Sequence, residues 1–159
     1  AFVHEERRLI KFSAEELFDI VSDVQSYDEF LPWCDQSTVH QRSEDGKELR
    51  AELKVGFRGL AEVYTSRVLL NRPRSIEVES VDSVLFEQLR SVWSLQSGPQ
   101  PGTCWLQFQV QFKFRSPLYN SVAGMFLEEV VKKMIAAFEK RCATAREKKE
   151  KEAVLGAVA

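Results

Sequence analysis

The longest amphipathic stretch of the chain covers residues 116–149 and has helical spacing. Two neighbouring rows of apolar residues, each with a step of four, form its apolar face. The first row is Tyr119, Ala123, Leu127, Val131 and Ile135, and the second is Val122, Phe126, Val130, Met134, Phe138 and Cys142. Ser116 is suited to cap this helix, and Pro117 fits its first position, where a missing N–H costs nothing. The spacing predicts one long helix that lies along a large apolar surface.

Between residues 33 and 114 the apolar residues recur with a period of two, which indicates strands. We expect strands over residues 33–42, 48–57, 60–71, 75–81, 86–96 and 103–114, separated by short segments rich in Gly, Pro and Asp. The alternation is clearest at Leu49, Ala51, Leu53, Val55 and Phe57, and at Leu106, Phe108, Val110, Phe112 and Phe114. Short connections without helices predict an antiparallel sheet with one apolar face.

The first part of the chain adds a strand and two short helices. Residues 2–12 read as a strand, and Ser13 with Glu16 forms a capping box that begins a helix reaching about Ser22. A second short helix is expected over residues 24–30 and ends before Pro32. The order of strand, two helices, six strands and long helix predicts an α+β fold. By analogy with known architectures, we expect a curved antiparallel sheet wrapped around the C-terminal helix.

We expect a single domain over residues 1–145, followed by a charged tail over residues 146–159 that is frayed or disordered. The chain has 159 residues, of which 44% are hydrophobic, and this is enough for one real core. A net charge of −2 gives no overall field to recruit nucleic acid. No apolar run approaches the ~18–20 residues that a membrane-spanning helix needs.

Candidate chemistry is sparse. Cys34, Cys104 and Cys142 lie far apart and form no metal-binding spacing. His4 and His40 share no spacing with a nucleophile, and each is expected at a surface or edge. By contrast, phenylalanine is frequent, with 11 residues. Two interpretations are open: these rings fill a tightly packed core, or sheet and helix leave an apolar cavity between them.

One charged residue is expected to point inward. In the strand over residues 60–71, the register that turns Arg67 outward turns Glu62, Tyr64 and Val68 inward. A buried carboxylate needs a partner. Either Glu62 binds the polar headgroup of a ligand beside Tyr64, or the register differs, or Glu62 pairs with a basic residue at the rim.

The segment over residues 27–34 joins the second short helix to the next strand. A loop interrupted by Pro32 cannot easily bury Phe30, Leu31 and Trp33 together. Either the loop folds back on the core, or it forms an exposed apolar tip that touches lipid or gates a cavity.

Several segments together resemble a known family, and the resemblance covers roughly residues 5–145. They are VQSYDEFLPWC at 24–34, VGF at 55–57, YTS at 64–66, FKFRS at 112–116, EEVV at 128–131 and AAFE at 136–139. The chain resembles the coenzyme Q-binding START-domain proteins of mitochondria, members of the polyketide cyclase-like, helix-grip superfamily. The first segment is the most specific part, and bacterial relatives share much of it.

The resemblance implies a helix-grip (START/Bet v 1-like) fold that binds and delivers ubiquinone without catalysis, in a cavity under the long helix. It implies support of respiratory electron transport and of ubiquinone biosynthesis, with no catalytic cofactor and no metal. The implied location is the matrix side of the mitochondrial inner membrane, peripherally bound, after removal of a leader not present in this chain. The implied partners are ubiquinone or other lipids, that membrane, the respiratory chain or the ubiquinone-biosynthesis complex, and a second copy of the chain, but not nucleic acid.

The inward positions and the resemblance together give a set of candidate residues. We expect ligand binding by Phe30, Trp33, Leu53, Val55, Phe57, Glu62, Tyr64, Val68, Trp93, Phe108, Val110, Phe112, Phe126, Val130 and Met134. We expect membrane contact through Phe30, Leu31, Pro32 and Trp33. Two alternatives are a polyketide cyclase-like enzyme that uses Glu62 and Tyr64 as an acid–base pair, and a ribosome-associated factor like some bacterial relatives. A ribosome-binding factor should have a basic face, which the net charge of −2 does not favour.

Overall fold

A computed structural model describes residues 2–57 and 60–158, with the backbone alone described at 57, 60, 122, 123 and 158. The elements are β1 (Phe2–Ile10), α1 (Ala14–Ser22), the 3-10 helix η1 (Val24–Glu29), β2 (Cys34–Arg42), β3 (Glu48–Phe57), β4 (Leu60–Asn71), β5 (Ser75–Ser83), β6 (Phe86–Ser97), β7 (Cys104–Phe114) and α2 (Pro117–Val158). The predicted order of elements is therefore confirmed, with boundaries that differ by a few residues at some strands.

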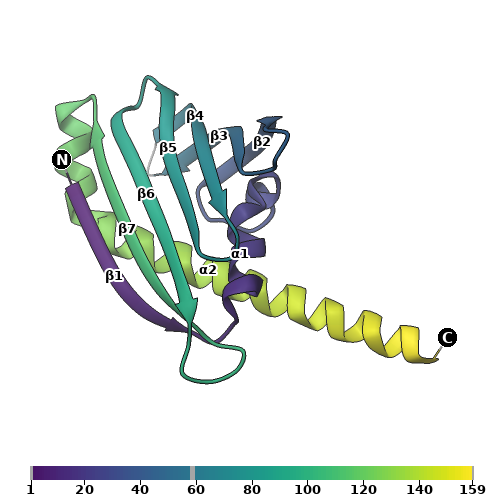
Figure 1. The fold of residues 1–159 in the computed structure, drawn as a ribbon. Helices are drawn as coiled ribbons and strands as arrows, with labels where there is room; N and C mark the ends of the chain where they lie inside the picture. The colour runs from purple at the N-terminus through teal and green to yellow at the C-terminus, as the bar shows by residue number, and fades with distance from the viewer. Residues whose placement is uncertain (1, 58–59, 159) are drawn as a thin grey trace.

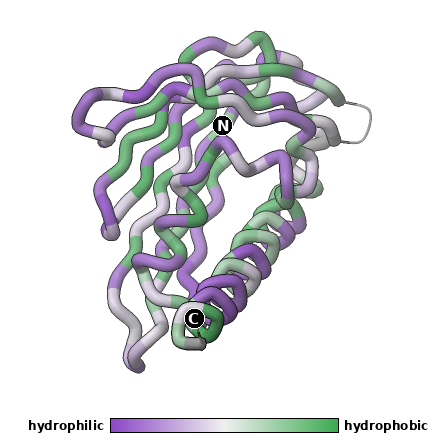
Figure 2. Tube along the Cα trace, turned by 90° about the vertical axis from the view of Figure 1, so that its right-hand side faces the viewer, coloured by the Kyte–Doolittle hydropathy of each residue, from purple (hydrophilic) through white to green (hydrophobic). Residues whose placement is uncertain are grey.

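The strands form one seven-stranded antiparallel sheet in the order β1-β7-β6-β5-β4-β3-β2. The sheet curves along one side of α2 (Figure 1). Viewed from the side, the sheet and α2 are two separate layers (Figure 2). The predicted α+β, helix-grip architecture is confirmed.

The start of α1 shows how the sequence sets a helix boundary. Ser13 accepts a hydrogen bond from the Glu16 backbone N–H, and the Glu16 carboxylate accepts one from the Ser13 backbone N–H, each at 3.1 Å. This reciprocal pair satisfies two N–H groups that the first turn of a helix would leave without partners. The capping box predicted from the sequence is confirmed.

The C-terminal end of α2 includes most of the charged tail. α2 continues to Val158 and its end projects away from the sheet (Figure 1), while fraying of residues 146–159 stays a prediction. The segment is rich in Ala, Glu, Lys and Arg, which favour helix, and Gly156 is its first glycine. The division of the chain at residue 145 stays a prediction.

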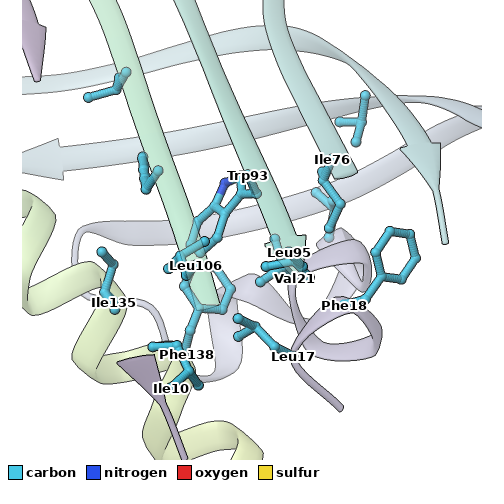
Figure 3. Packing of buried hydrophobic residues seen from close by; sticks show 14 of the residues in the cluster. Ile10, Leu17, Phe18, Val21, Ile76, Trp93, Leu95, Leu106, Ile135 and Phe138 are labelled. Carbon is cyan, nitrogen blue, oxygen red and sulfur yellow. The ribbon is translucent and has the colours of Figure 1, made fainter. Parts of the chain in front are cut away.

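The hydrophobic core is packed most fully where α1 and the middle of α2, from Val131 to Cys142, meet the sheet, and we call this region the packed end. Figure 3 shows side chains from α1, from β1, from three central strands and from α2 converging there. They include Ile10, Leu17, Val21, Ile76, Leu95, Leu106, Ile135 and Phe138, each at most 2% exposed. The packed end anchors α2 on the sheet and leaves the N-terminal half of the helix to cover the rest of the inward face.

Candidate functional site

An apolar cavity of about 340 Å³ lies between the inward face of the sheet and the N-terminal half of α2. The described residues that line it are Tyr27, Leu31, Pro32, Trp33, Cys34, Leu53, Val55, Tyr64, Val78, Leu85, Phe86, Leu89, Ser91, Trp93, Phe108, Val110, Phe112, Phe114, Phe126, Leu127, Val130, Val131, Met134 and Phe138. Sheet and helix therefore do not close completely, which decides between the two interpretations of the phenylalanine-rich sequence. The volume falls within the ~300–1,000 Å³ typical of ligand sites.

The structure brings together most of the residues that the sequence nominated. The predicted residues found in the lining are Trp33, Leu53, Val55, Tyr64, Trp93, Phe108, Val110, Phe112, Phe126, Val130 and Met134. The lining residues that were not nominated as ligand-binding are Tyr27, Leu31, Pro32, Cys34, Val78, Leu85, Phe86, Leu89, Ser91, Phe114, Leu127, Val131 and Phe138. Phe114 continues the alternation of β7, so the pattern contained a signal for it.

Three nominated residues lie outside the lining. Val68 is 1% exposed and belongs to the core, deeper along β4 than Tyr64. Glu62 is half-buried and pairs with Val55, so it shares the inward face but lies beside the cavity wall. Phe30 packs against Phe138, as described below. The side chain of Phe57, also nominated, lies outside the described part of the chain.

Aromatic rings give the cavity stiff walls. The ring of Phe86 stacks on Phe114 with centroids 4.8 Å apart, and Tyr64 meets Phe86 edge-on at 5.4 Å. Deeper in the cavity, Trp93 lies 4.8 Å from Phe108. Such ring pairs add stabilisation of about 0.5–1.5 kcal/mol each beyond the area they bury. The cavity is therefore preformed rather than a gap between loosely packed side chains.

The polar groups of the wall are electrically neutral. Burial raises the pKa of Tyr64 above its usual range, and burial first of all raises the pKa of the Cys34 thiol to about 11. The Tyr27 hydroxyl, whose pKa is likewise raised mainly by burial, donates a hydrogen bond to the Val21 carbonyl. All three side chains remain protonated near neutral pH, which suits the site to an uncharged ligand.

The sequence left open whether the loop after η1 folds back on the core or forms an apolar tip beside a cavity, and the structure shows parts of both arrangements. Phe30 folds onto the core, with its ring 5.5 Å from that of Phe138 and the Arg141 guanidinium 5.0 Å from its centroid. Leu31 and Trp33 are half-buried in the cavity wall. Trp33 has a φ of +68°, a left-handed conformation that bulky residues rarely adopt. The loop is therefore part of the cavity.

Further apolar side chains are exposed beside the cavity. Val84 is 79% exposed and directly precedes the lining residues Leu85 and Phe86, and Met125 is 77% exposed and directly precedes the lining residue Phe126. Leu118, in the first turn of α2, is 68% exposed. Arg115 ties this region together, because its backbone N–H donates to the Leu85 carbonyl and its Nε to the Ser83 carbonyl, each at 3.1 Å. We call Val84, Leu118 and Met125 the apolar rim.

The described residues offer little for catalysis or metal binding. Over residues 2–57 and 60–158, no group of three or more His, Cys, Asp and Glu side chains is placed to hold a metal ion. His4 lies 3.5 Å from Glu6 and His40 lies 3.7 Å from Glu52, and neither histidine lines the cavity. In the same described ranges, no helix is both long and apolar enough to cross a membrane.

The fold and the cavity define a helix-grip protein with an apolar cavity between sheet and helix. A family model described as polyketide cyclase / dehydrase and lipid transport matches residues 10–139, and the chain belongs to this family. A START superfamily protein from Mycobacterium smegmatis has a similar structure, with a TM-score of 0.81 and 19% identity, over 91% of this chain and 99% of that chain. This structural likeness concerns the fold alone.

Two curated relatives carry different names. The mitochondrial coenzyme Q-binding protein COQ10 homolog B of Xenopus laevis is 39% identical over 140 residues, which cover 87% of this chain and 57% of that protein. The ribosome association toxin RatA of Rickettsia prowazekii is 35% identical over 138 residues, which cover 84% of this chain and 91% of that protein. The chain thus spans little more than half the length of the coenzyme Q-binding relative and nearly all of the bacterial one.

Proposed function

We propose that this protein binds coenzyme Q (ubiquinone) in the cavity under α2 and delivers it without chemical change. The observation that carries the proposal is the aromatic, uncharged lining of a preformed cavity that reaches the exposed Pro32. Such a lining is suited to a greasy ring-bearing ligand. The similarity to a coenzyme Q-binding relative supports this choice of ligand.

The size of the cavity limits how much of the ligand it encloses. A volume of about 340 Å³ is near the lower end of the ~300–1,000 Å³ range of small-molecule sites. We infer that it holds the ring and the beginning of the isoprenoid tail. The rest of the tail stays at the mouth of the cavity, the opening beside the exposed Pro32. Lipid or a second copy of the chain covers it there, because each exposed CH₂ costs about 0.8 kcal/mol.

The lining residues divide into two roles in this proposal. The ring lies among Tyr64, Phe86 and Phe114, with the Tyr64 hydroxyl as a hydrogen-bond donor to a carbonyl oxygen. The tail passes along the half-buried side chains of α2 that face the sheet, Phe126, Val130 and Met134. Glu62 lies on the hairpin formed by β3 and β4, beside the cavity wall. It would therefore influence the ligand from beside the lining and not as a lining residue.

Delivery requires that the mouth of the cavity meets a membrane. Leu31, Pro32 and Trp33 would contact lipid on one side, and the apolar rim of Val84, Leu118 and Met125 would add a second contact. Arg115 is exposed and, within the described chain, has no carboxylate partner, so it is available to anionic headgroups. Binding through such a surface is peripheral and reversible.

We place this activity at the matrix side of the mitochondrial inner membrane, in support of respiration and ubiquinone biosynthesis. The mitochondrial designation of the coenzyme Q-binding relative supports the compartment. The receivers of the quinone would be the respiratory chain or the ubiquinone-biosynthesis complex.

The direct test is to identify what the purified protein carries. Protein expressed in a quinone-producing host is extracted with organic solvent, and the extract is analysed by mass spectrometry. We expect ubiquinone in a defined ratio to protein, and its absence together with failure to bind added short-tail ubiquinone would reject the proposal. Incubation with aromatic polyketides tests the cyclase alternative, for which Glu62 is poorly placed because it lies outside the lining.

Ribosome association is the second candidate function. It is favoured by the sequence similarity to the ribosome association toxin RatA of Rickettsia prowazekii, which is 35% identical over 138 residues. Co-sedimentation with ribosomes, with and without added ubiquinone, separates the two functions. Sedimentation with ribosomes by a quinone-free protein would favour the second candidate.

A further inference from the structure

The polar atoms in the cavity wall are few, and they are mainly hydrogen-bond donors. Side-chain N–H, O–H and S–H groups are contributed by Tyr27, Trp33, Cys34, Tyr64, Ser91 and Trp93. The described lining residues include no carboxylate, imidazole, amide or amine. The cavity therefore lacks a strong acceptor and a basic group, although it has several groups that can donate.

Trp93 and Tyr64 are two donors in the lining that a ligand can reach. Trp93 is 4% exposed, and its indole nitrogen is a donor only. Figure 3 shows this nitrogen on the side of the ring farthest from Leu17 and Phe138. Across the described residues, neither the Trp93 N–H nor the Tyr64 hydroxyl has a hydrogen-bond partner, although both side chains line the cavity. Both side chains face the cavity space, so an acceptor on a ligand that fills the cavity can pair with them, whereas an apolar ligand would leave the two donors unpaired.

The remaining polar groups do not change this balance. The Tyr27 hydroxyl is already used, because it donates to the Val21 carbonyl. The Cys34 thiol donates to the Gln36 carbonyl at 3.5 Å and is at best a weak acceptor. Ser91 adds one hydroxyl that can donate or accept.

Resting on the function proposed above, we propose that the cavity selects the oxidised, quinone form of its ligand over the reduced quinol. A fully substituted benzoquinone carries only acceptors, namely two carbonyl oxygens and the ether oxygens of its substituents. The Tyr64 hydroxyl can donate to such a ring beside Phe86 and Phe114, and the Trp93 N–H is a further donor deeper in the cavity. A quinol instead brings two O–H donors into a wall where only hydroxyl oxygens accept, and each unsatisfied donor weakens binding.

The absence of a strong acceptor has a second consequence for the bound ring. Reduction of a quinone to a quinol takes up two electrons and two protons, and the reverse step releases them. The described lining residues contain no base to receive those protons. The cavity therefore holds the ring without assisting its redox chemistry, as expected of a carrier that keeps its ligand in one state.

The test compares the two redox forms of one ligand by isothermal titration calorimetry under nitrogen. The ligands are a short-tail ubiquinone and the same compound reduced to its quinol. We expect the quinone to bind at least about tenfold more tightly, a difference of about 1.4 kcal/mol. Equal affinities, or tighter quinol binding, would overturn this inference while leaving the proposed function in place. Binding of neither form would reject both.

A conservative variant then tests the assigned donor. Tyr64→Phe keeps the ring and removes the hydroxyl, so it should lower quinone affinity and reduce the preference for quinone over quinol. The matched control is Tyr119→Phe, because Tyr119 lies on α2 outside the lining and is 38% exposed. An undiminished preference in Tyr64→Phe would overturn the role of this hydroxyl, and thermal unfolding of each variant checks that the fold is kept.

Discussion

Glu16 and Arg146 are joined by two hydrogen bonds across 130 residues of sequence, from the Arg146 Nε to Oε2 at 2.8 Å and from its terminal nitrogen to Oε1 at 2.6 Å. The same arginine lies over the ring of Phe12, with its guanidinium carbon 4.5 Å from the ring centroid. The pair clamps the first turn of α1 to α2 at the packed end. It extends the contacts of the folded domain one residue past position 145.

The ion pair predicts a specific dependence of stability on acid. The hydrogen bond from Arg146 is the main cause that lowers the pKa of Glu16 from 4.5 to about 2. Because the folded-state pKa is the lower one, the stabilisation is present above the unfolded pKa and is lost as pH falls through the folded pKa. Glu16→Gln should therefore lower the free energy of unfolding by about 1 kcal/mol at pH 7, a difference that shrinks between about pH 4.5 and 2.

Urea unfolding of both proteins from pH 7 down to pH 3 measures this difference. Glutamine keeps the ability to accept the capping hydrogen bond, so the substitution removes mainly the charge. Glu15→Gln is the matched control, since Glu15 is exposed in the same helical turn. A difference that stays constant from pH 7 to pH 3 would contradict the assignment.

The alternation in the sequence predicted which side chains point to the inward face of the sheet. It did not predict which of these inward side chains line the cavity and which lie in the packed core. Tyr64 and Val68 share the inward face of β4, yet Tyr64 lines the cavity and Val68 is 1% exposed in the core. Glu62 shares that face at the other side of Tyr64 and lies outside the wall. The positions of α1 and α2 on the sheet decide which part of a strand lies in the packed core and which part lines the cavity. A period of two in the sequence carries no information about those positions.

A β-bulge explains another part of the site that the pattern missed. The register between β6 and β7 shifts between Phe86 and Gln88, so Phe86 and Leu89 both face the cavity although they are three residues apart. Simple alternation would have placed them on opposite faces. The walls built by regular strands, such as Phe108 and Phe112, were predicted because no irregularity interrupts them.

A close approach between α2 and β1 gives the second prediction. A Cβ at Gly124 would lie 2.7 Å from the ring of Phe2, which stacks on the lining residue Phe112 at 5.3 Å. Alanine favours helix over glycine by about 1 kcal/mol, but the ring opposes this gain. Gly124→Ala should therefore stabilise the protein more when Phe2→Ala is also present, by about 0.5 kcal/mol or more.

Chemical unfolding of the four proteins in this double-mutant cycle measures the coupling. Gly156→Ala is the control, because a Cβ there would meet nothing within 4 Å. Its effect should be the same with and without Phe2→Ala. Additive effects of Gly124→Ala and Phe2→Ala would show that Phe2 moves aside without cost.

The third prediction fills the cavity. Val130 is half-buried on the wall formed by α2, so Val130→Phe places a larger side chain in the path proposed for the tail. We expect affinity for short-tail ubiquinone to fall at least about tenfold, near 1.4 kcal/mol, with little change in melting temperature. Val154→Phe is the matched control, since Val154 lies on the same helix at 63% exposure. Unchanged quinone binding in Val130→Phe would move the binding site away from this cavity.

Glu62 gives the fourth prediction. Because it is half-buried beside the wall, Glu62→Gln should weaken quinone retention less than Val130→Phe does and should leave the melting temperature nearly unchanged. Glu52→Gln serves as the control, because Glu52 is exposed on the neighbouring strand. If Glu62→Gln prevents folding, the carboxylate is a structural ion-pair partner instead.

The last prediction concerns the loop and the apolar rim at the cavity mouth. A ligand as greasy as ubiquinone does not leave a bilayer through water unaided, because each exposed CH₂ costs about 0.8 kcal/mol. The mouth should therefore open against lipid, and the Trp33 indole, with an apolar body and a polar N–H, suits such an interface. We expect Leu31→Ser with Trp33→Ser to keep the fold but to lower binding to liposomes and to slow quinone uptake.

A second double variant, Val84→Ser with Leu118→Ser, separates the two parts of this surface. It lies outside the cavity lining, so it should lower liposome binding while leaving the affinity for short-tail ubiquinone in solution unchanged. Trp33 lines the cavity, so the loop variant should weaken both. Co-sedimentation with liposomes that contain anionic lipid measures the first quantity, and calorimetry measures the second. If both double variants still bind liposomes as well as the unmodified protein does, the apolar side chains around this mouth do not contribute to membrane binding. The membrane contact must then lie on another face of the protein.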